Sequence, residues 1–283
     1  MNVDFFTMCI NTPEILDLTY KSLKSNIDID LLQCDLYLNV DVLLNNDNLS
    51  DIKVVAEKYF KNVIINFSYE NNCNKAFIWG INNVKKDFTF IIESNKCIKE
   101  NFSINTMINE LISSEKIVEC ALSPMRSNGV IKYLTSHPSL WKTSWLKKMN
   151  HLFSPYLNYE YQLRELGLLD NKIGRTLARN KKILNHIGKE WKDKNKYILG
   201  NSSTDDEIQD IIENNKEWHK KIYDIYSIKS DINNRIIYNF KLKNQDKEWI
   251  YRWTGIWKYV LINKKNFVLR HMRKTYYCNQ NAI

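Results

Sequence analysis

The segment Asp87–Ile98, DFTFIIESNKCI, carries two polar side chains directly after an apolar run. Residues 88–92 predict a buried strand, and Glu93 and Asn95 follow at its carboxyl end. In α/β enzymes, ligands bind at the carboxyl ends of strands. A carboxylate and an amide oxygen at this spacing can contribute to the oxygen shell of a hard divalent cation, although the amide adds no charge. The alternative is that both residues merely end a strand.

Motifs for other kinds of chemistry are missing from the sequence. It contains no GxSxG, Walker-type loop, GxGxxG or HExxH, and the six cysteines are dispersed without zinc-type spacing. Several cysteines lie in apolar runs, which predicts free thiols in a reducing compartment. The start, MNVDFF, does not resemble a secretion signal, and no apolar run approaches 18 residues. We therefore expect a cytoplasmic protein without a transmembrane segment.

Strands and helices alternate along the first hundred residues. Apolar runs predict strands at 3–10, 34–44, 62–69 and 87–92. Helical spacing of apolar residues, with Thr12 and Ser50 as N-caps, predicts the helices that connect them, at 12–26, 48–60 and 74–85. This alternation with short turns predicts an α/β fold in which a mostly parallel sheet is flanked by helices.

The remaining sequence predicts a second, smaller part. Helices at 103–114, 143–150 and 154–171 and strands at 118–126, 130–141 and 181–191 would complete a domain of residues 1–200. A polar stretch separates this domain from residues 201–283, for which we expect a helical extension rich in basic and aromatic residues. Trp249, Trp253 and Trp257 are four residues apart and would form one stripe on a helix, which we expect to pack the extension against the first domain.

The basic charge is concentrated at the end of the chain. Residues 229–283 contain twelve Lys and Arg but three Asp and Glu, which accounts for the whole formal net charge of +9. Ten Phe, Trp and Tyr residues are interleaved with these cations. This asymmetry predicts a polyanionic partner, either nucleic acid or an anionic membrane surface.

The order of several segments resembles the nucleotide-sugar glycosyltransferases of the GT-A type, in particular the inverting family 2. In CINTPEILDLTYKSL, Asn11 matches the turn that holds the nucleotide, although Cys9 and Thr12 depart from the family pattern. In YLNVDVL, Asp41 matches the aspartate that reaches the base or ribose. The Asn-rich segment ENNCNKAF then implies Asn74 or Lys75 as a further nucleotide contact, so a nucleotide-sugar donor is expected.

The later segments of this resemblance imply a metal site and a catalytic base. Glu93 and Asn95 stand where the family has Asp-x-Asp, so a divalent cation, Mn²⁺ or Mg²⁺, is expected to bind there, more weakly than between two carboxylates. The segment NHIGKEW implies His186 as a metal ligand and Lys189 as a phosphate contact. Glu160, early in a helix whose dipole favours the ionised carboxylate, is implied as the general base.

The acceptor is suggested by a narrower resemblance. LYLNVDVL, the run from Asn74 to Ser94, and HIGKEW are similar to bacteriophage glycosyltransferases that modify hydroxymethylated pyrimidines such as 5-hydroxymethylcytosine in DNA. This implies transfer of a hexose or pentose from a UDP-sugar to DNA with inversion. The expected DNA contacts are Trp141, Lys264, Lys265, Arg270, Arg273 and Lys274. The alternatives are a surface-glycan or lipid-linked acceptor, or a non-catalytic GT-A relic that binds nucleotide or polyanion.

Overall fold

The computed structural model divides the chain into two units, Met1–Leu199 and Gly200–Ile283. In the first unit it describes residues 2–42, 48–70, 72–122, 130–131, 134–135, 138–177 and 183–187. In the second it describes residues 217–218, 221–222, 225, 241–242, 249–250, 257–263, 266–271 and 274–279.

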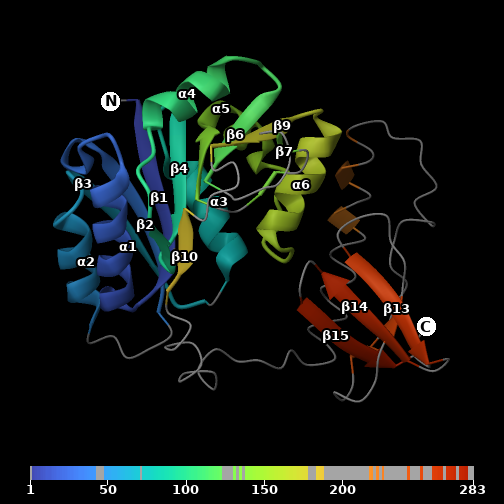
Figure 1. The fold of residues 1–283 in the computed structure, drawn as a ribbon. Coiled ribbons are helices and arrows are strands. Elements are labelled where there is room, and N and C mark those ends of the chain that lie inside the picture. Colours follow the sequence, from blue (N-terminus) through green and yellow to red (C-terminus); the bar gives the residue numbers. More distant parts are fainter. Residues whose placement is uncertain are drawn as a thin grey trace. The chain divides into compact units, whose positions relative to one another are not determined.

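An eight-stranded sheet forms the centre of the first unit, in the order β3-β2-β1-β4-β8-β6-β9-β7 (Figure 1). Its strands are β1 (Val3–Ile10), β2 (Asp35–Asp41), β3 (Asn62–Ser68), β4 (Phe88–Glu93), β6 (Ile117–Ala121), β7 (Val130–Ile131), β8 (Ser139–Lys142) and β9 (Ile173–Thr176). Strands β3, β2, β1 and β4 are mutually parallel, whereas β8 runs antiparallel to both β4 and β6. The carboxyl ends of the first four strands therefore lie at one edge.

Helices connect these strands and cover the sheet. They are α1 (Pro13–Asn26), α2 (Leu49–Glu57), α3 (Cys73–Asn83), α4 (Ile104–Ile112), α5 (Thr143–Asn150) and α6 (Tyr159–Leu169), with a short 3-10 turn, η1 (Leu31–Gln33). Pro13 occupies the first turn of α1, as the sequence predicts, and the Ser103 hydroxyl caps α4. Helices α1 and α2 lie side by side in Figure 1.

Alternating side chains of β1 show that both faces of the sheet are buried. Phe5 lies in the core that α1, α2 and α4 cover, with its ring centroid 5.3 Å from that of Phe60. Phe6, the next residue, points to the opposite face and contacts Phe77 and Trp79 of α3 at centroid distances of 6.4 and 6.5 Å. The near-continuous apolar character of the strand follows from this double burial. The predicted α/β class is confirmed.

A small ribbon lies beside the main sheet. Strand β5 (Lys96–Ile98) pairs antiparallel with β10 (Leu184–His186), so that Lys96 is opposite His186. The Thr19 hydroxyl of α1 donates to the Ser94 carbonyl and fixes the turn between β4 and β5. This ribbon returns a late part of the chain to the carboxyl end of β4.

The second unit corrects one prediction. Its described residues between 241 and 279 form the strands β11 (Lys241–Leu242), β12 (Trp249–Ile250), β13 (Trp257–Asn263), β14 (Asn266–His271) and β15 (Lys274–Asn279), not helices. Trp249 and Trp257 belong to different strands, so they form no helical stripe, and Trp253 lies outside the described residues. The segments are rich in Val, Ile, Tyr and Trp, which favour strands. Residues 217–218, 221–222 and 225 are helical, as expected for this part of the extension.

Two further observations concern membrane-spanning helices and the state of the cysteines. No helix among the described residues combines the length and the apolar character needed to cross a bilayer. Cys9, Cys34 and Cys120 are buried free thiols, as the sequence predicts, whereas Cys73, also a free thiol, is exposed at the start of α3.

Candidate functional site

The ends of β1 and β2 are held together by a cluster of asparagines. The Asn11 amide donates to the Asp41 carbonyl at 3.3 Å, and the Asn11 side chain is fully buried. Asn11 Nδ2 donates to Asn48 Oδ1 at 3.0 Å, while Asn48 Nδ2 donates back to the Asn11 carbonyl at 2.6 Å. Asn11 therefore shapes the turn after β1 and joins it to the start of α2, which is a positioning role.

Asp41 ends β2 as a buried carboxyl group. The residue is 7% exposed, and burial raises the pKa of its carboxyl to about 6, although a hydrogen bond from Asn39 Nδ2 at 3.0 Å opposes this increase. Burial and the Asp41 charge also raise the pKa of the neighbouring Cys9 thiol. Among the described residues, no Lys, Arg or His forms an ion pair with Asp41. Such a carboxyl can accept hydrogen bonds from a ligand, and acidic residues with shifted pKa values are common at functional sites.

Glu93 ends β4 and is held by two residues that the sequence did not single out. Tyr159 Oη donates to Glu93 Oε1 at 3.2 Å, and Lys96 Nζ lies 3.2 Å from Glu93 Oε2. Glu93 is opposite Met8 of β1, whereas Asp41 is opposite Ile10 on the other side of that strand. The two residues are thus two strands apart across the sheet and two residues apart along it, which separates their Cα atoms by about 12 Å. They can contact different parts of one ligand but cannot share a metal ion.

Asn95 and His186 are brought together by the ribbon. The Ile187 amide donates to the Asn95 carbonyl at 2.9 Å, and His186 pairs with Lys96 across the ribbon. Asn95 Oδ1 is buried and has no hydrogen-bond partner among the described residues. The backbone of His186 thus lies beside the Glu93–Asn95 segment, while its side chain lies outside the described part of the structure, so its role as a metal ligand stays a prediction.

The start of α3 is joined to the start of α6. Asn72 caps α3 by accepting from the amides of Asn74 and Lys75, each at 3.0 Å. Asn74 Oδ1 accepts from the Tyr159 amide at 2.9 Å, and Asn74 Nδ2 donates to the Pro155 carbonyl at 3.4 Å. Asn74, one of the two side chains expected to contact the nucleotide, is thus engaged in positioning α6. Lys75 forms an exposed ion pair with Glu70.

Glu160, the expected base, lies in the first turn of α6. Asn158 caps this helix by accepting from the Tyr161 amide at 3.1 Å, and Glu160 is half-buried. Its chain neighbour Tyr159 is buried, stacks on Phe77 at 4.5 Å and reaches Glu93. Because of these contacts, the helix start that carries Glu160 lies at the same edge of the sheet as the end of β4.

Other expected site residues are not gathered here. Trp141 is 1% exposed, donates to Ser139 Oγ at 2.7 Å and stacks on Trp145 at 5.9 Å. A ring with both faces packed inside the protein cannot stack on a base, so Trp141 is a core residue. Arg270 and Lys274 lie in β14 and β15 of the second unit. Lys189, Lys264, Lys265 and Arg273 lie outside the described residues.

The described residues do not fit a divalent cation well. Mn²⁺ and Mg²⁺ need several oxygen ligands, preferably charged ones. Glu93 is the single carboxylate at the end of β4, and it is already paired with the ammonium of Lys96, which would repel a second cation. Asn95 adds one neutral oxygen, and no group of three His, Cys, Asp or Glu in the described part of the chain could hold a metal ion. This arrangement differs from the metal site that the resemblance implies.

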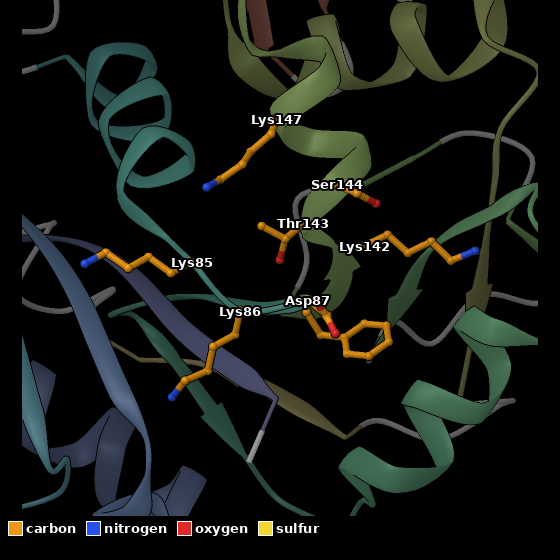
Figure 2. A pocket seen from close by; sticks show the side chains of 8 residues that line it. Lys85, Lys86, Asp87, Lys142, Thr143, Ser144 and Lys147 are labelled. Atoms are coloured by element: carbon orange, nitrogen blue, oxygen red, sulfur yellow. The ribbon is translucent and has the colours of Figure 1, made fainter.

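A cavity of about 350 Å³ lies elsewhere, at the amino end of β4 (Figure 2). It is lined by Lys85, Lys86, Asp87, Phe88, Lys142, Thr143, Ser144 and Lys147. Two of its four lysines are engaged, because Lys86 pairs with Asp35 at 2.8 Å and Lys142 Nζ donates to the Ser114 carbonyl at 2.9 Å. The length of β4 separates this cavity from Glu93 by about 17 Å. We therefore assign the candidate site to the polar residues at the carboxyl edge.

Comparison with solved structures identifies the architecture. The chain is similar to S. aureus TarS 1–349 in complex with UDP, with a TM-score of 0.52 and 12% identity over 79% of this chain and 66% of that chain. The complex of the same protein with UDP-GlcNAc gives a TM-score of 0.53, 12% identity and coverage of 79% and 67%. The chain has the GT-A fold.

A third similar structure is the mannosyltransferase PcManGT from Pyrobaculum calidifontis in complex with GDP-Man and Mn²⁺. It has a TM-score of 0.50 and 8% identity over 78% of this chain and 69% of that chain. This chain thus spans about two thirds of the length of these proteins. No protein-family model matches the sequence, and no curated protein does.

Proposed function

We propose that this chain is a glycosyltransferase that uses a nucleotide-sugar donor, with a UDP-sugar as the first candidate. The observation that carries the proposal is the collection of Asp41, Glu93 and the start of α6 at the carboxyl edge of a GT-A sheet. Ligands of open α/β sheets bind at this edge. The similar solved structures are complexes with UDP, UDP-GlcNAc and GDP-Man, which supports a nucleotide-sugar donor for this chain as well.

The positions of the polar residues suggest a division of roles. Asp41, at the end of β2 beside the turn that follows β1, would accept hydrogen bonds from the nucleoside. The end of β4 would then face the diphosphate. Glu160 would take the proton of the acceptor hydroxyl, whose oxygen attacks the anomeric carbon while the bond to the nucleoside diphosphate breaks. One displacement of this kind inverts the anomeric configuration.

The assignment of Glu160 is tested by Glu160→Gln, with Glu165→Gln in the same helix as the matched control. We expect Glu160→Gln to reduce sugar transfer by about 100-fold or more, because general-base catalysis contributes that much, while UDP affinity stays within about twofold. UDP release from UDP-glucose and UDP-GlcNAc measures turnover, and calorimetry measures UDP affinity. Full activity of Glu160→Gln would show that another group is the base.

For the acceptor we propose a hydroxymethylated pyrimidine in phage DNA, which would be modified in the cytoplasm of the host. The support is the net excess of nine positive charges in residues 229–283, since Lys and Arg neutralise phosphates. Strand pairing in the second unit also brings basic residues next to one another: Lys258 is opposite Arg270, and His271 is opposite Lys274.

Incubation with labelled UDP-glucose and hydroxymethylated duplex, with unmodified duplex as control, tests this acceptor. Incorporation that requires the hydroxymethyl group and decreases with salt is the expected result. If several UDP-sugars give no incorporation into DNA but transfer to a surface glycan or lipid-linked sugar occurs, the DNA proposal is wrong. Tight UDP binding without turnover on any acceptor would instead indicate a non-catalytic GT-A protein.

A further inference from the structure

A buried lysine lies where the resemblance leads one to expect a metal ion. Lys96 is the first residue of β5, immediately after the Glu93–Asn95 segment, and its side chain is 8% exposed. Its Nζ lies 3.2 Å from Glu93 Oε2. Lysine is rarely buried to this degree without a charged partner. The end of β4 therefore carries its own cation, covalently part of the chain.

The contacts of Glu93 indicate that it positions this lysine. One carboxylate oxygen faces the Lys96 ammonium, and the other accepts the hydroxyl hydrogen of Tyr159, which is itself fixed by its stacking on Phe77. A carboxylate held from both sides in this way can orient an ammonium, but it offers little to a divalent ion. Asn95 Oδ1, the other oxygen of the segment, is neutral and cannot offset the charge of a second cation.

We propose that Lys96 provides the positive charge that neutralises the diphosphate of the donor, so that donor binding does not require a divalent cation. An ammonium group is a well-established phosphate ligand. When the bond from the anomeric carbon to the diphosphate breaks, the electron pair moves to a phosphate oxygen, and the Lys96 ammonium stabilises that charge. This inference rests on the proposed glycosyltransferase function. Glu93 and Tyr159 then act as positioning residues.

The full-length chain tests the inference without any substitution. After treatment with EDTA, its affinities for UDP, GDP, CDP, ADP and TDP are measured by calorimetry, and the titrations are repeated with Mn²⁺ and with Mg²⁺. For the nucleotide that binds, we expect the two metal conditions and the EDTA condition to agree within about threefold, because the cation is supplied by the protein.

Two matched variants identify the lysine. Lys96→Gln is expected to weaken nucleotide binding in EDTA by about tenfold or more, which is the effect of losing one charged hydrogen bond. Lys99→Gln, three residues further on at an exposed position, should leave the affinity unchanged. Since Lys96→Gln leaves Glu93 without this ion pair, Mn²⁺ should restore part of the lost affinity in that variant alone. Circular dichroism verifies that each variant is folded.

Each outcome is decisive. Binding by the unsubstituted chain that requires Mn²⁺ or Mg²⁺ would overturn the role of Lys96 while leaving the proposed function intact. Equal binding by Lys96→Gln and the unsubstituted chain in EDTA would do the same. If none of the five nucleotides binds under any condition, the proposed function itself fails, and the inference fails with it.

Discussion

Asp41→Asn should stabilise the fold and weaken ligand binding at the same time. The Asp41 carboxyl is buried at the end of β2, and burial raises its pKa to about 6, whereas unfolding returns it to its ordinary value. Ionisation is therefore less favourable in the folded protein than in the unfolded chain. Stability from this group is fully present below about pH 4 and is lost as the pH rises through about 6. Asparagine at this position removes the pH dependence of stability and retains a side-chain oxygen that can accept the hydrogen bond from Asn39 Nδ2.

The size of the effect follows from the pKa. A carboxyl whose pKa rises from 3.8 to about 6 loses at most about 3 kcal/mol of stability at neutral pH, at 1.36 kcal/mol for each pKa unit. Because the carboxyl lies at the edge of the sheet and is partly screened by water, we expect about 1–2 kcal/mol. Asp41→Asn should be more stable than the unsubstituted chain by this amount at pH 7.5 and by much less at pH 4.5.

Urea unfolding at the two pH values measures the difference, and a UDP titration at pH 7.5 should show weaker binding by about tenfold. Asp35→Asn, at the other end of β2, is the matched control. Burial opposes ionisation of Asp35, but hydrogen bonds from Lys86 and Asn62 lower its pKa, so its removal should destabilise the fold at pH 7.5. The reasoning is refuted if Asp41→Asn is the less stable protein at pH 7.5.

Two further substitutions test the packing of Gly80 against Phe6 and the ionisation of the buried Glu119 carboxyl. Gly80→Ala would place a Cβ atom 2.2 Å from Cζ of the buried Phe6 ring, so we expect the free energy of unfolding in urea to decrease by about 1–3 kcal/mol. The control is Asn82→Ala, at an exposed position of the same helix, which should change this free energy by about 0.5 kcal/mol or less. Equal stabilities of the two variants would contradict this packing. Glu119→Gln should become progressively more stable than the unsubstituted chain between pH 5 and pH 9. The reason is that burial raises the pKa of Glu119 to about 8 despite hydrogen bonds from Thr135, and a difference independent of pH would argue against that pKa.

The sequence predicted the first unit well because its signals are local. Each strand of the parallel half is an apolar run, and each connecting helix begins at a recognisable turn, as at Thr12–Pro13. Parallel strands end at one edge, so the order of elements alone puts Asp41 and Glu93 at the same edge of the sheet. Fold class depends on this alternation and not on any single residue.

Side-chain pairing was not predictable in the same way. Lys96 and Tyr159 contact Glu93 because of a turn after β4 and the contacts of Asn74 with α6, and no periodicity in the sequence specifies either. Trp141 was misplaced because its strand, β8, is enclosed between β4 and β6. In the second unit, aromatic residues four apart satisfy both the helical period and the two-residue period of a strand, and their strand propensity prevailed.

The ribbon of β5 and β10 gives the first unit a weak point next to its candidate site. Lys96 and His186 are ninety positions apart in the sequence, and the pairing between these strands is short: three residue pairs, flanked by backbone hydrogen bonds from Ile187 to Asn95 and from Lys99 to Ile183. Separating the ribbon would require far less free energy than disrupting β1 to β4, so it can open locally while the sheet stays folded. Heating should therefore abolish nucleotide binding before it unfolds the protein, and bound nucleotide should slow amide hydrogen exchange most strongly in residues 96–98 and 184–186.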